Sequence, residues 1–146
     1  MKLKVDEVLS CFQVINKIMY DKQEERRLPF KIKLKLTRIK DVFEKTIELY
    51  ENQRLELVRK YGDPVKTKSI NEDGVEVEIE TGNISVSNPD KMKKFSKEIG
   101  EVLNEESEYN FEKIPKDYIT LIEDIEMDIS ERDIKVLFIY LVDNES

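Results

Sequence analysis

The feature of this sequence that most constrains its fold is a long series of apolar residues spaced as on one face of a helix. Between Pro29 and Gly62, apolar side chains recur every three, four or seven positions: Ile32, Leu36, Ile39, Phe43, Tyr50, Leu57 and Tyr61. That spacing places them on one face of a single α-helix. Proline suits the first turn of a helix and glycine suits the position after its end. The sequence therefore predicts one helix of about 32 residues, roughly 48 Å long at 1.5 Å per residue.

The beginning of this helix lies in the most basic segment of the chain, "RRLPFKIKLKLTRIK". Lys31, Lys35 and Arg38 fall within about 60° of each other on a helix, as clustered phosphate contacts require. They flank an apolar face, however, and the segment lacks both base-reading amides and interleaved aromatic residues. This favours a solvated face, or one paired with the acidic half of the chain. Binding of nucleic acid is disfavoured, and an acidic protein partner stays open.

A shorter helix is predicted before the long one. Apolar residues from Val8 to Met19 recur at intervals of three and four, and Asp6 is the expected N-cap. A polar break, "YDKQEERR", separates the two helices. Residues 5–62 are therefore expected to form an N-terminal helical hairpin dominated by the long helix.

The middle of the chain, residues 65–106, predicts a β-hairpin followed by a helix. Residues 65–70 and 75–79 flank Asp73-Gly74, a dipeptide typical of hairpin turns. Ile84 and Val86 are interpreted as a short third strand. Ser87 or Asn88, followed by Pro89, indicates the start of a helix whose apolar residues run from Met92 to Leu103.

The C-terminal part, residues 107–142, predicts a short strand over "EYNFEKI", a short helix over "KDYITLIEDI" and a last helix. Ser130 and Asp133 resemble a capping box for that helix, which is expected to reach about Leu141. Residues 136–142 fit a buried strand equally well, because periodicity does not separate the two. The chain is thus predicted to be one α+β domain, residues 1–146, with a small antiparallel sheet.

The charge of the chain is unevenly distributed. The net charge is +6 over residues 1–70 and −13 over residues 71–146, which makes −7 in total. Two interpretations remain open: the halves pack together and partly neutralise each other, or they form separate faces for two partners. The acidic half would suit a DNA mimic, a contact with a basic assembly surface, or solubility alone.

The residue types argue against an enzyme. Histidine is absent, Cys11 is the single cysteine, and the four glycines are scattered, so a histidine base and a phosphate-binding loop are excluded. Asp124, Glu126 and Asp128 alternate as in a calcium loop, but the turn glycine of such a loop is missing. We expect no catalytic residues, no cofactor and no metal site, and a purely structural role for Cys11.

We expect an intracellular protein that is not secreted through a signal peptide. Lys4, Asp6 and Glu7 are charged where a signal peptide would need an apolar stretch. No apolar run approaches the 18 residues of a membrane-spanning helix.

Several sequence segments within residues 1–106 are similar to those of a known protein family: "MKLKVDEVLSCFQVINKI", "LPFKIKLKL", "ENQRLELVRKYGD", a hairpin, and "KKFSKEIGEVLNEE". They resemble a family of small proteins of unknown function encoded by phages and prophages of Gram-positive bacteria. The tail "FEKIPKDYI…ISERDIKVLFIYL" is similar to the end region of such proteins. The chain departs from the family in its longer break "DKQEERR" and in the extension of its hairpin. The resemblance implies a phage origin, a location in the host cytoplasm or within the virion, and either an accessory or a virion role. The family has no assigned catalytic residues, so none is carried over.

These observations predict a non-enzymatic protein–protein interaction module, virion-associated or acting in assembly, that binds a phage structural protein, a host protein or its own copy. The alternative is an acidic inhibitor of a host protein, in host takeover or against host defence, with a DNA mimic as one form. Buried aromatic residues and arginine dominate such contacts. The expected interface comprises Phe43, Tyr50, Leu57 and Tyr61, with Lys31, Lys35 and Arg38 at its rim.

Overall fold

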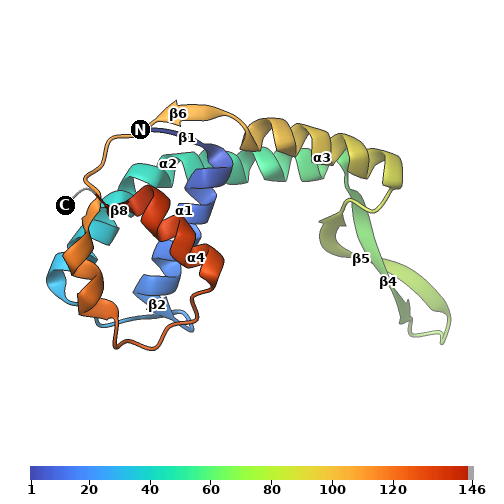
Figure 1. The fold of residues 1–146 in the computed structure, drawn as a ribbon. Coiled ribbons are helices and arrows are strands. Elements are labelled where there is room, and N and C mark those ends of the chain that lie inside the picture. Colours follow the sequence, from blue (N-terminus) through green and yellow to red (C-terminus); the bar gives the residue numbers. More distant parts are fainter. Residues whose placement is uncertain (145–146) are drawn as a thin grey trace. The chain divides into compact units, whose positions relative to one another are not determined.

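The computed structural model describes residues 1–144 and divides the chain into two compact units. Unit 1 contains residues 1–48 and 104–146, and unit 2 contains residues 49–103. The long helix α2 (Phe30–Tyr61) contributes its first part to unit 1 and its last part to unit 2 (Figure 1). The predicted α+β class, with one long helix and small sheets, is confirmed. That residues 1–146 form a single domain stays a prediction.

Unit 1 holds the hydrophobic core, which is built mainly from α1 (Val5–Met19) and the first part of α2 (Figure 1). The spacing of apolar residues explains it, because the buried residues of each helix recur on one face. The buried residues of the two helices are Val5, Val8, Cys11, Val14, Ile15, Ile18, Met19, Ile32, Leu36, Ile39 and Phe43.

The ends of α2 lie where proline and glycine predicted them. The Lys33 N–H donates to the Pro29 carbonyl over 3.1 Å, and the Gly62 N–H donates to the Val58 carbonyl over 2.7 Å. The segment from Phe30 to Leu36 is therefore the beginning of the helix, and its alternation of apolar and basic residues does not form a strand.

The expected N-cap of α1, Asp6, is wrong. The helix begins at Val5, and the Glu7 carboxylate accepts a 2.9 Å hydrogen bond from the Lys4 N–H. Just before it, strand β1 (Lys2–Lys4) pairs antiparallel with β6 (Glu106–Glu108), and the Val5 N–H donates to the Glu105 carbonyl. These pairings order the chain up to Lys4, so the helix starts directly after the strand.

The polar break after α1 forms a small hairpin that the sequence did not predict. Strand β2 (Tyr20–Asp21) pairs with β3 (Glu24–Glu25). The turn residues Lys22 and Gln23 have φ values of 49° and 70°, a left-handed conformation that tight hairpin turns require and that Asn-Gly normally supplies.

The C-terminal segment of unit 1 ends in a helical stretch over residues 131–141, followed by a short strand. It contains β7 (Ile114–Pro115), the 3₁₀-helix η1 (Lys116–Ile122), α4 (Glu131–Val136), the π-helix η2 (Leu137–Leu141) and β8 (Val142–Asp143), which is parallel to β7. The capping box is confirmed, because Ser130 Oγ accepts from the Asp133 N–H and the Asp133 carboxylate accepts from the Ser130 N–H. The open choice between helix and strand over residues 136–142 is thus decided for helix, with Val142 in a strand.

The strand expected over "EYNFEKI" is wrong in position. Strand β6 ends at Glu108 and β7 begins at Ile114. Tyr109 and Phe111 instead contact Phe43 edge-to-face, with ring centroids 5.5 and 5.4 Å away. Tyr109 also exchanges backbone hydrogen bonds with Met1, so aromatic packing follows directly on the end of the strand pairing.

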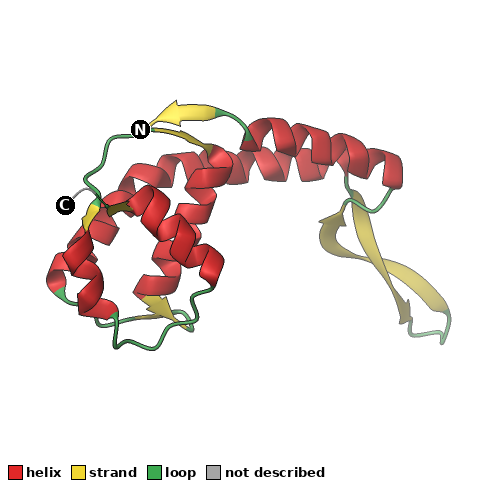
Figure 2. Cartoon of the chain, viewed as in Figure 1, coloured by secondary structure: helices red, strands yellow, loops and turns green. Residues whose placement is uncertain are grey.

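Unit 2 consists of the end of α2, a hairpin of β4 (Asp63–Ile70) and β5 (Glu76–Ser85), and α3 (Pro89–Leu103) (Figure 2). The expected third strand is wrong: Ile84 belongs to β5, opposite Pro64, beyond a register shift between Pro64 and Lys66. Gly82, with a φ of 81°, lies at this irregularity and lets β5 continue past it.

The helix α3 begins as the sequence predicted. Asn88 Oδ1 accepts hydrogen bonds from the N–H groups of Asp90 and Lys91, at 3.0 and 3.2 Å. Lys60 Nζ on α2 lies 3.4 Å from a carboxylate oxygen of Glu98 on α3, so the two helices lie side by side.

Candidate protein-binding surface

Unit 2 lacks a buried core. None of its residues, all of which the structure describes, is buried, whereas unit 1 contains every buried residue of the described chain. Seven large apolar side chains of unit 2 are between 40% and 74% exposed. We refer to these seven side chains together, wherever each one points, as the unit 2 apolar surface: Leu49, Leu55, Ile70, Val75, Ile79, Ile84 and Met92. This surface is the strongest candidate for a functional site in the described chain.

The helices of unit 2 cover each other only in part. Tyr50, Leu57 and Tyr61 on α2 are half-buried, as are Phe95 and Ile99 on α3. The apolar residues of α3 are spaced as on a buried face, yet none is buried. Charge supports the pairing of the helices only weakly, because Lys60–Glu98 is an exposed ion pair. A second exposed pair, Lys91–Asp63, joins α3 to β4.

The base of the hairpin packs tightly against the end of α2. A Cβ atom added to Gly62 would lie 2.3 Å from Ile84 Cγ2 and 2.4 Å from the Val58 carbonyl oxygen. Such distances are far below van der Waals contact, so only glycine fits here. Gly62 therefore allows β5 to approach the helix closely, which is a more specific role than ending the helix.

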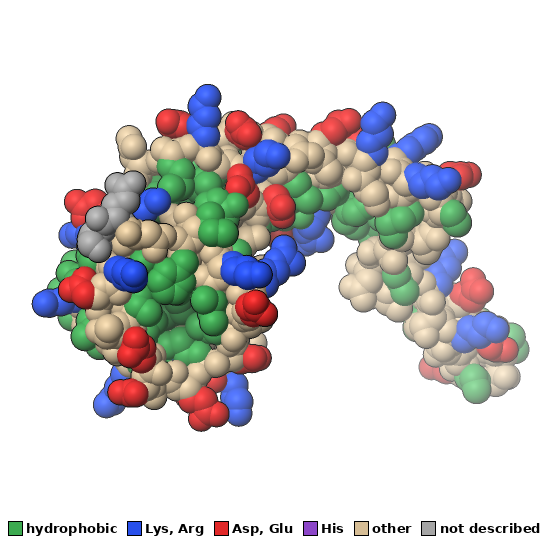
Figure 3. Space-filling model, in the orientation of Figure 1, with side chains coloured by type: hydrophobic (Ala, Val, Ile, Leu, Met, Phe, Trp, Pro, Cys, Tyr) green, Lys and Arg blue, Asp and Glu red, His purple; other side chains and the backbone are tan. Residues whose placement is uncertain are grey.

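The two faces of the hairpin differ in chemistry. Lys66 is opposite Glu80 and Lys68 is opposite Glu78, and these side chains share what we call the charged face. On the other face Thr67 is opposite Ile79 and Ser69 is opposite Val77. Acidic and basic side chains lie next to each other over β4 and β5 in Figure 3. Because Ile79 is 48% exposed, the apolar face also lacks a complete cover.

The structure divides the predicted interface residues between the units. Tyr50, Leu57 and Tyr61 lie in unit 2, beside the apolar surface, and each keeps part of its side chain accessible. Lys31, Lys35, Arg38 and Phe43 lie in unit 1. The seven residues therefore do not form one interface within either unit.

Phe43 requires a correction. Its exposed fraction is 0%, because the rings of Tyr109 and Phe111 enclose it together with the core of unit 1. A residue without accessible surface cannot contact a partner. The sequence placed it on the interface because the C-terminal segment that covers it is distant along the chain.

The basic segment is partly paired with the acidic C-terminal part of unit 1. Lys35 forms an ion pair with Glu112, and Arg26 donates a 2.9 Å hydrogen bond to the Glu126 carbonyl. The hydrogen bond from Lys35 lowers the pKa of Glu112. Lys31 and Arg38 remain exposed.

The net charge is −5 for unit 1 and −2 for unit 2. Unit 1 therefore contains most of the basic residues of the first half of the chain together with most of the acidic residues of the second half.

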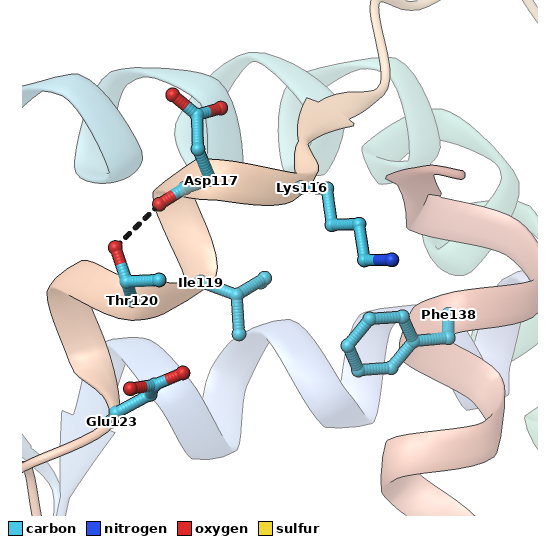
Figure 4. A pocket seen from close by; sticks show the side chains of 6 residues that line it. All are labelled: Lys116, Asp117, Ile119, Thr120, Glu123 and Phe138. Atoms are coloured by element: carbon cyan, nitrogen blue, oxygen red, sulfur yellow. Dashed lines mark hydrogen bonds between the residues drawn. The ribbon is translucent and has the colours of Figure 1, made fainter. Parts of the chain in front are cut away.

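Unit 1 also contains a shallow pocket of about 480 Å³, within the usual range for small-molecule sites. Figure 4 shows Ile119 of η1 and the Phe138 ring pointing toward each other across it, with Lys116 above the ring. The hydroxyl of Thr120 donates to the Asp117 carbonyl over 2.6 Å. The pocket's one hydroxyl is therefore bound to backbone.

Two buried or half-buried titratable groups of unit 1 have raised pKa values. Burial, and then the Glu7 charge, raise the pKa of Cys11 to about 12, which favours the protonated thiol over the thiolate. A hydrogen bond to Glu7, followed by burial, raises the pKa of Tyr140 to about 12. Both groups serve packing and hydrogen bonding inside the fold.

Within residues 1–144, no three acidic or cysteine side chains are grouped so that they could hold a metal ion. Asp124, Glu126 and Asp128 lie in the loop before α4 and are exposed. No helix in the same range is both long enough and apolar enough to cross a membrane. No known family, curated protein or solved structure matches the chain.

Sequence reasoning did not predict the unit 2 apolar surface as a whole. It named Tyr50, Leu57 and Tyr61 but passed over Leu55, Ile79 and Met92. The apolar spacing on α3 is typical of a buried face, so it indicated a core and gave no sign of exposure. The alternation along β5, "EVEIE", was the available signal, because it predicts a hairpin with one apolar face that needs a cover.

Proposed function

We propose that this chain is a non-enzymatic protein–protein interaction module encoded by a phage, and that unit 2 is its binding part. It would act in the host cytoplasm as an assembly component or within the virion. The observation that carries this proposal is the unit 2 apolar surface, which lies on a unit without a single buried residue.

Burial of apolar surface is the main favourable term in folding and in protein association. Unit 2 exposes apolar side chains on both helices and on the hairpin. A two-stranded hairpin is marginally stable on its own and gains stability from packing. Contact with another protein would supply the missing cover, which supports a binding role for this unit.

The chemistry of the surface supports a protein partner. Tyr50 and Tyr61 lie beside the exposed leucines of α2, and tyrosine contributes strongly to interfaces because it combines an apolar ring with a hydroxyl. The resemblance of residues 1–106 to phage proteins supports a phage component as that partner. The ion pairs of the basic segment, such as Lys35–Glu112, argue against binding of phosphates, because their cations are already paired with carboxylates.

The proposal is tested by mass spectrometry of purified phage particles together with affinity capture. Two variants are compared with the natural chain: Leu55→Gln with Met92→Gln in unit 2, and Ile139→Gln in unit 1. Ile139 is 61% exposed and is a matched control for loss of an exposed apolar side chain. We expect the unit 2 variant to be depleted from particles and the control variant to be retained.

Equal incorporation of both variants would overturn the binding role of unit 2. Absence of the natural chain from particles, with one host protein captured through unit 2 instead, would support the alternative of a host inhibitor.

A further inference from the structure

The hairpin of unit 2 has two open edges. Strands β4 and β5 form a two-stranded sheet, so among the described residues neither has a second neighbouring strand. An open edge presents unpaired N–H and C=O groups that can pair with a strand of another chain. Pro64 and the register shift, which hinder such pairing, lie at one end of β4 and leave Lys66–Ile70 regular.

The charges of the hairpin are separated by strand. On the charged face β4 carries Lys66 and Lys68, whereas β5 carries Glu76, Glu78 and Glu80. These side chains are accessible, since Lys68 and Glu76, 3.5 Å apart, keep 72% and 63% of their side-chain surface. One edge of the hairpin is therefore basic and the other is acidic.

This separation decides how two hairpins can pair. Like charges directly opposite each other destabilise a sheet, and opposite charges stabilise it. Pairing β5 with β5 would oppose glutamates, and pairing β4 with β4 would oppose lysines. Pairing β4 of one copy with β5 of another would place each lysine between two glutamates, one from its own hairpin and one from the neighbour.

We propose that copies of this chain assemble through their hairpins, with the basic edge of β4 paired to the acidic edge of β5 in the next copy. This inference rests on the proposed function, in that unit 2 is the binding part, and adds a contact at the hairpin edges whose partner is a second copy of the chain. The strand order would be β5–β4–β5–β4, antiparallel throughout. The two edges in contact differ, so the contact is head-to-tail and generates a ring or a filament rather than a symmetric dimer.

Charge reversal on each edge tests this assembly. The acidic variant carries Lys66→Glu and Lys68→Glu, and the basic variant carries Glu76→Lys, Glu78→Lys and Glu80→Lys. In either variant every possible edge pairing opposes like charges. In an equal mixture, the acidic β4 of one variant faces the basic β5 of the other, so complementary edges are restored between copies but not within a hairpin.

The readout is the mass in solution, measured over a wide range of concentrations. The natural chain is expected at several times its 17.3 kDa, and each variant alone at the single-chain mass. The equal mixture is expected to return to several times that mass. Lys93→Glu with Lys94→Glu, a reversal at exposed positions of α3, is the control for net charge and is expected to assemble normally.

Three results would each overturn the inference: a natural chain of single mass at every concentration, assembly that persists in either variant, or a mixture that stays at the single mass. Circular dichroism shows whether either variant alone has lost the β-structure of its hairpin. If a variant has lost it, the equal mixture must regain that β-structure. A natural chain that is monomeric yet present in particles defeats this inference alone. Assembled chains that are absent from particles count against the virion role alone.

Discussion

Lys17 of α1 and Asp133 of α4 are joined by a hydrogen bond of 2.7 Å between ammonium and carboxylate. Asp133 is the one charged residue that is buried in the described chain, and its carboxylate also accepts a hydrogen bond from the Ser130 N–H in the capping box of α4. Burial alone raises the pKa of Asp133, but the bonds from Lys17 and Ser130 outweigh it and hold that pKa below its usual value. The pair therefore attaches the last helix to the first.

Replacing Asp133 with asparagine keeps the shape of the cap and removes the charge. We expect the free energy of unfolding to fall by about 1.5–3 kcal/mol, the usual range for a hydrogen bond to a charged group. Glu131→Gln is the control, because Glu131 pairs with Lys135 at 3.7 Å on the exposed side of the same helix. Loss of this exposed ion pair should lower the free energy of unfolding by about 0.5 kcal/mol or less. Urea unfolding measures both.

The Asp133 carboxylate should also make the stability of the fold depend on pH in the acid range. Because the folded state lowers the pKa of Asp133, the stabilisation is present above its unfolded pKa of about 3.9 and is lost as the pH falls from there toward the folded value. The loss of stability below about pH 4 should be smaller in Asp133→Asn than in the natural chain. Parallel curves for the two proteins would contradict the pairing.

Phe43 and Leu49 lie on the same helix in opposite environments, with exposed fractions of 0% and 55%. Phe43→Ala should lower the free energy of unfolding by about 3–5 kcal/mol, because it leaves a cavity against Tyr109 and Phe111. Leu49→Ala should change it by about 0.5 kcal/mol or less. Denaturant unfolding of both variants checks the difference. Similar costs would contradict the placement of Phe43 in the core.

Replacing Gly62 and Gly100 with alanine should change the stability of unit 2 in opposite directions. At Gly62 the new Cβ would collide with Ile84 and the Val58 carbonyl, so unit 2 should lose about 1–3 kcal/mol. At Gly100, within α3, nothing lies within 4 Å of the new Cβ, and alanine should stabilise the helix by about 0.5–1 kcal/mol. Hydrogen exchange of unit 2 amides measures both, and stabilisation by both substitutions would refute the close approach of β5.

Tyr140 predicts a loss of stability in strong base. Its pKa of about 12 exceeds the ordinary value near 10, so the stabilisation is complete below pH 10 and is lost as the pH rises through 12. Comparing the tyrosinate absorbance of the natural chain with that of Tyr140→Phe isolates this titration among the six tyrosines. A difference titration centred near pH 10 would show that the bond to Glu7 is absent.

Local signals were enough to predict where three of the helices begin. Pro29, Asn88 and the pair Ser130 and Asp133 each act within a few residues, so the sequence alone places the starts of α2, α3 and α4. The start of α1 was misplaced because it depends on the pairing of β1 with β6, more than a hundred residues away. No short-range pattern carries that information.

The candidate site was predictable only in part for the same reason. Tyr50, Leu57 and Tyr61 follow from the helical repeat, and Phe43 belongs to the same repeat. What separates them is the cover that Tyr109 and Phe111 give to Phe43, a tertiary contact that periodicity does not encode. The exposure of Met92 and Ile79 likewise depends on what fails to pack against them, which only the structure shows.

The central claim, that another protein covers the unit 2 apolar surface, is tested most directly by the rate at which Met92 is oxidised. Met92 is 42% exposed, Met1 is 38% exposed and Met19 is 5% exposed, so the chain carries its own exposed and buried references. In the isolated chain Met92 should oxidise about as fast as Met1. In purified particles or the assembled complex it should slow toward Met19 while Met1 is unchanged, and a Met92 that stays as reactive as Met1 there would contradict the claim.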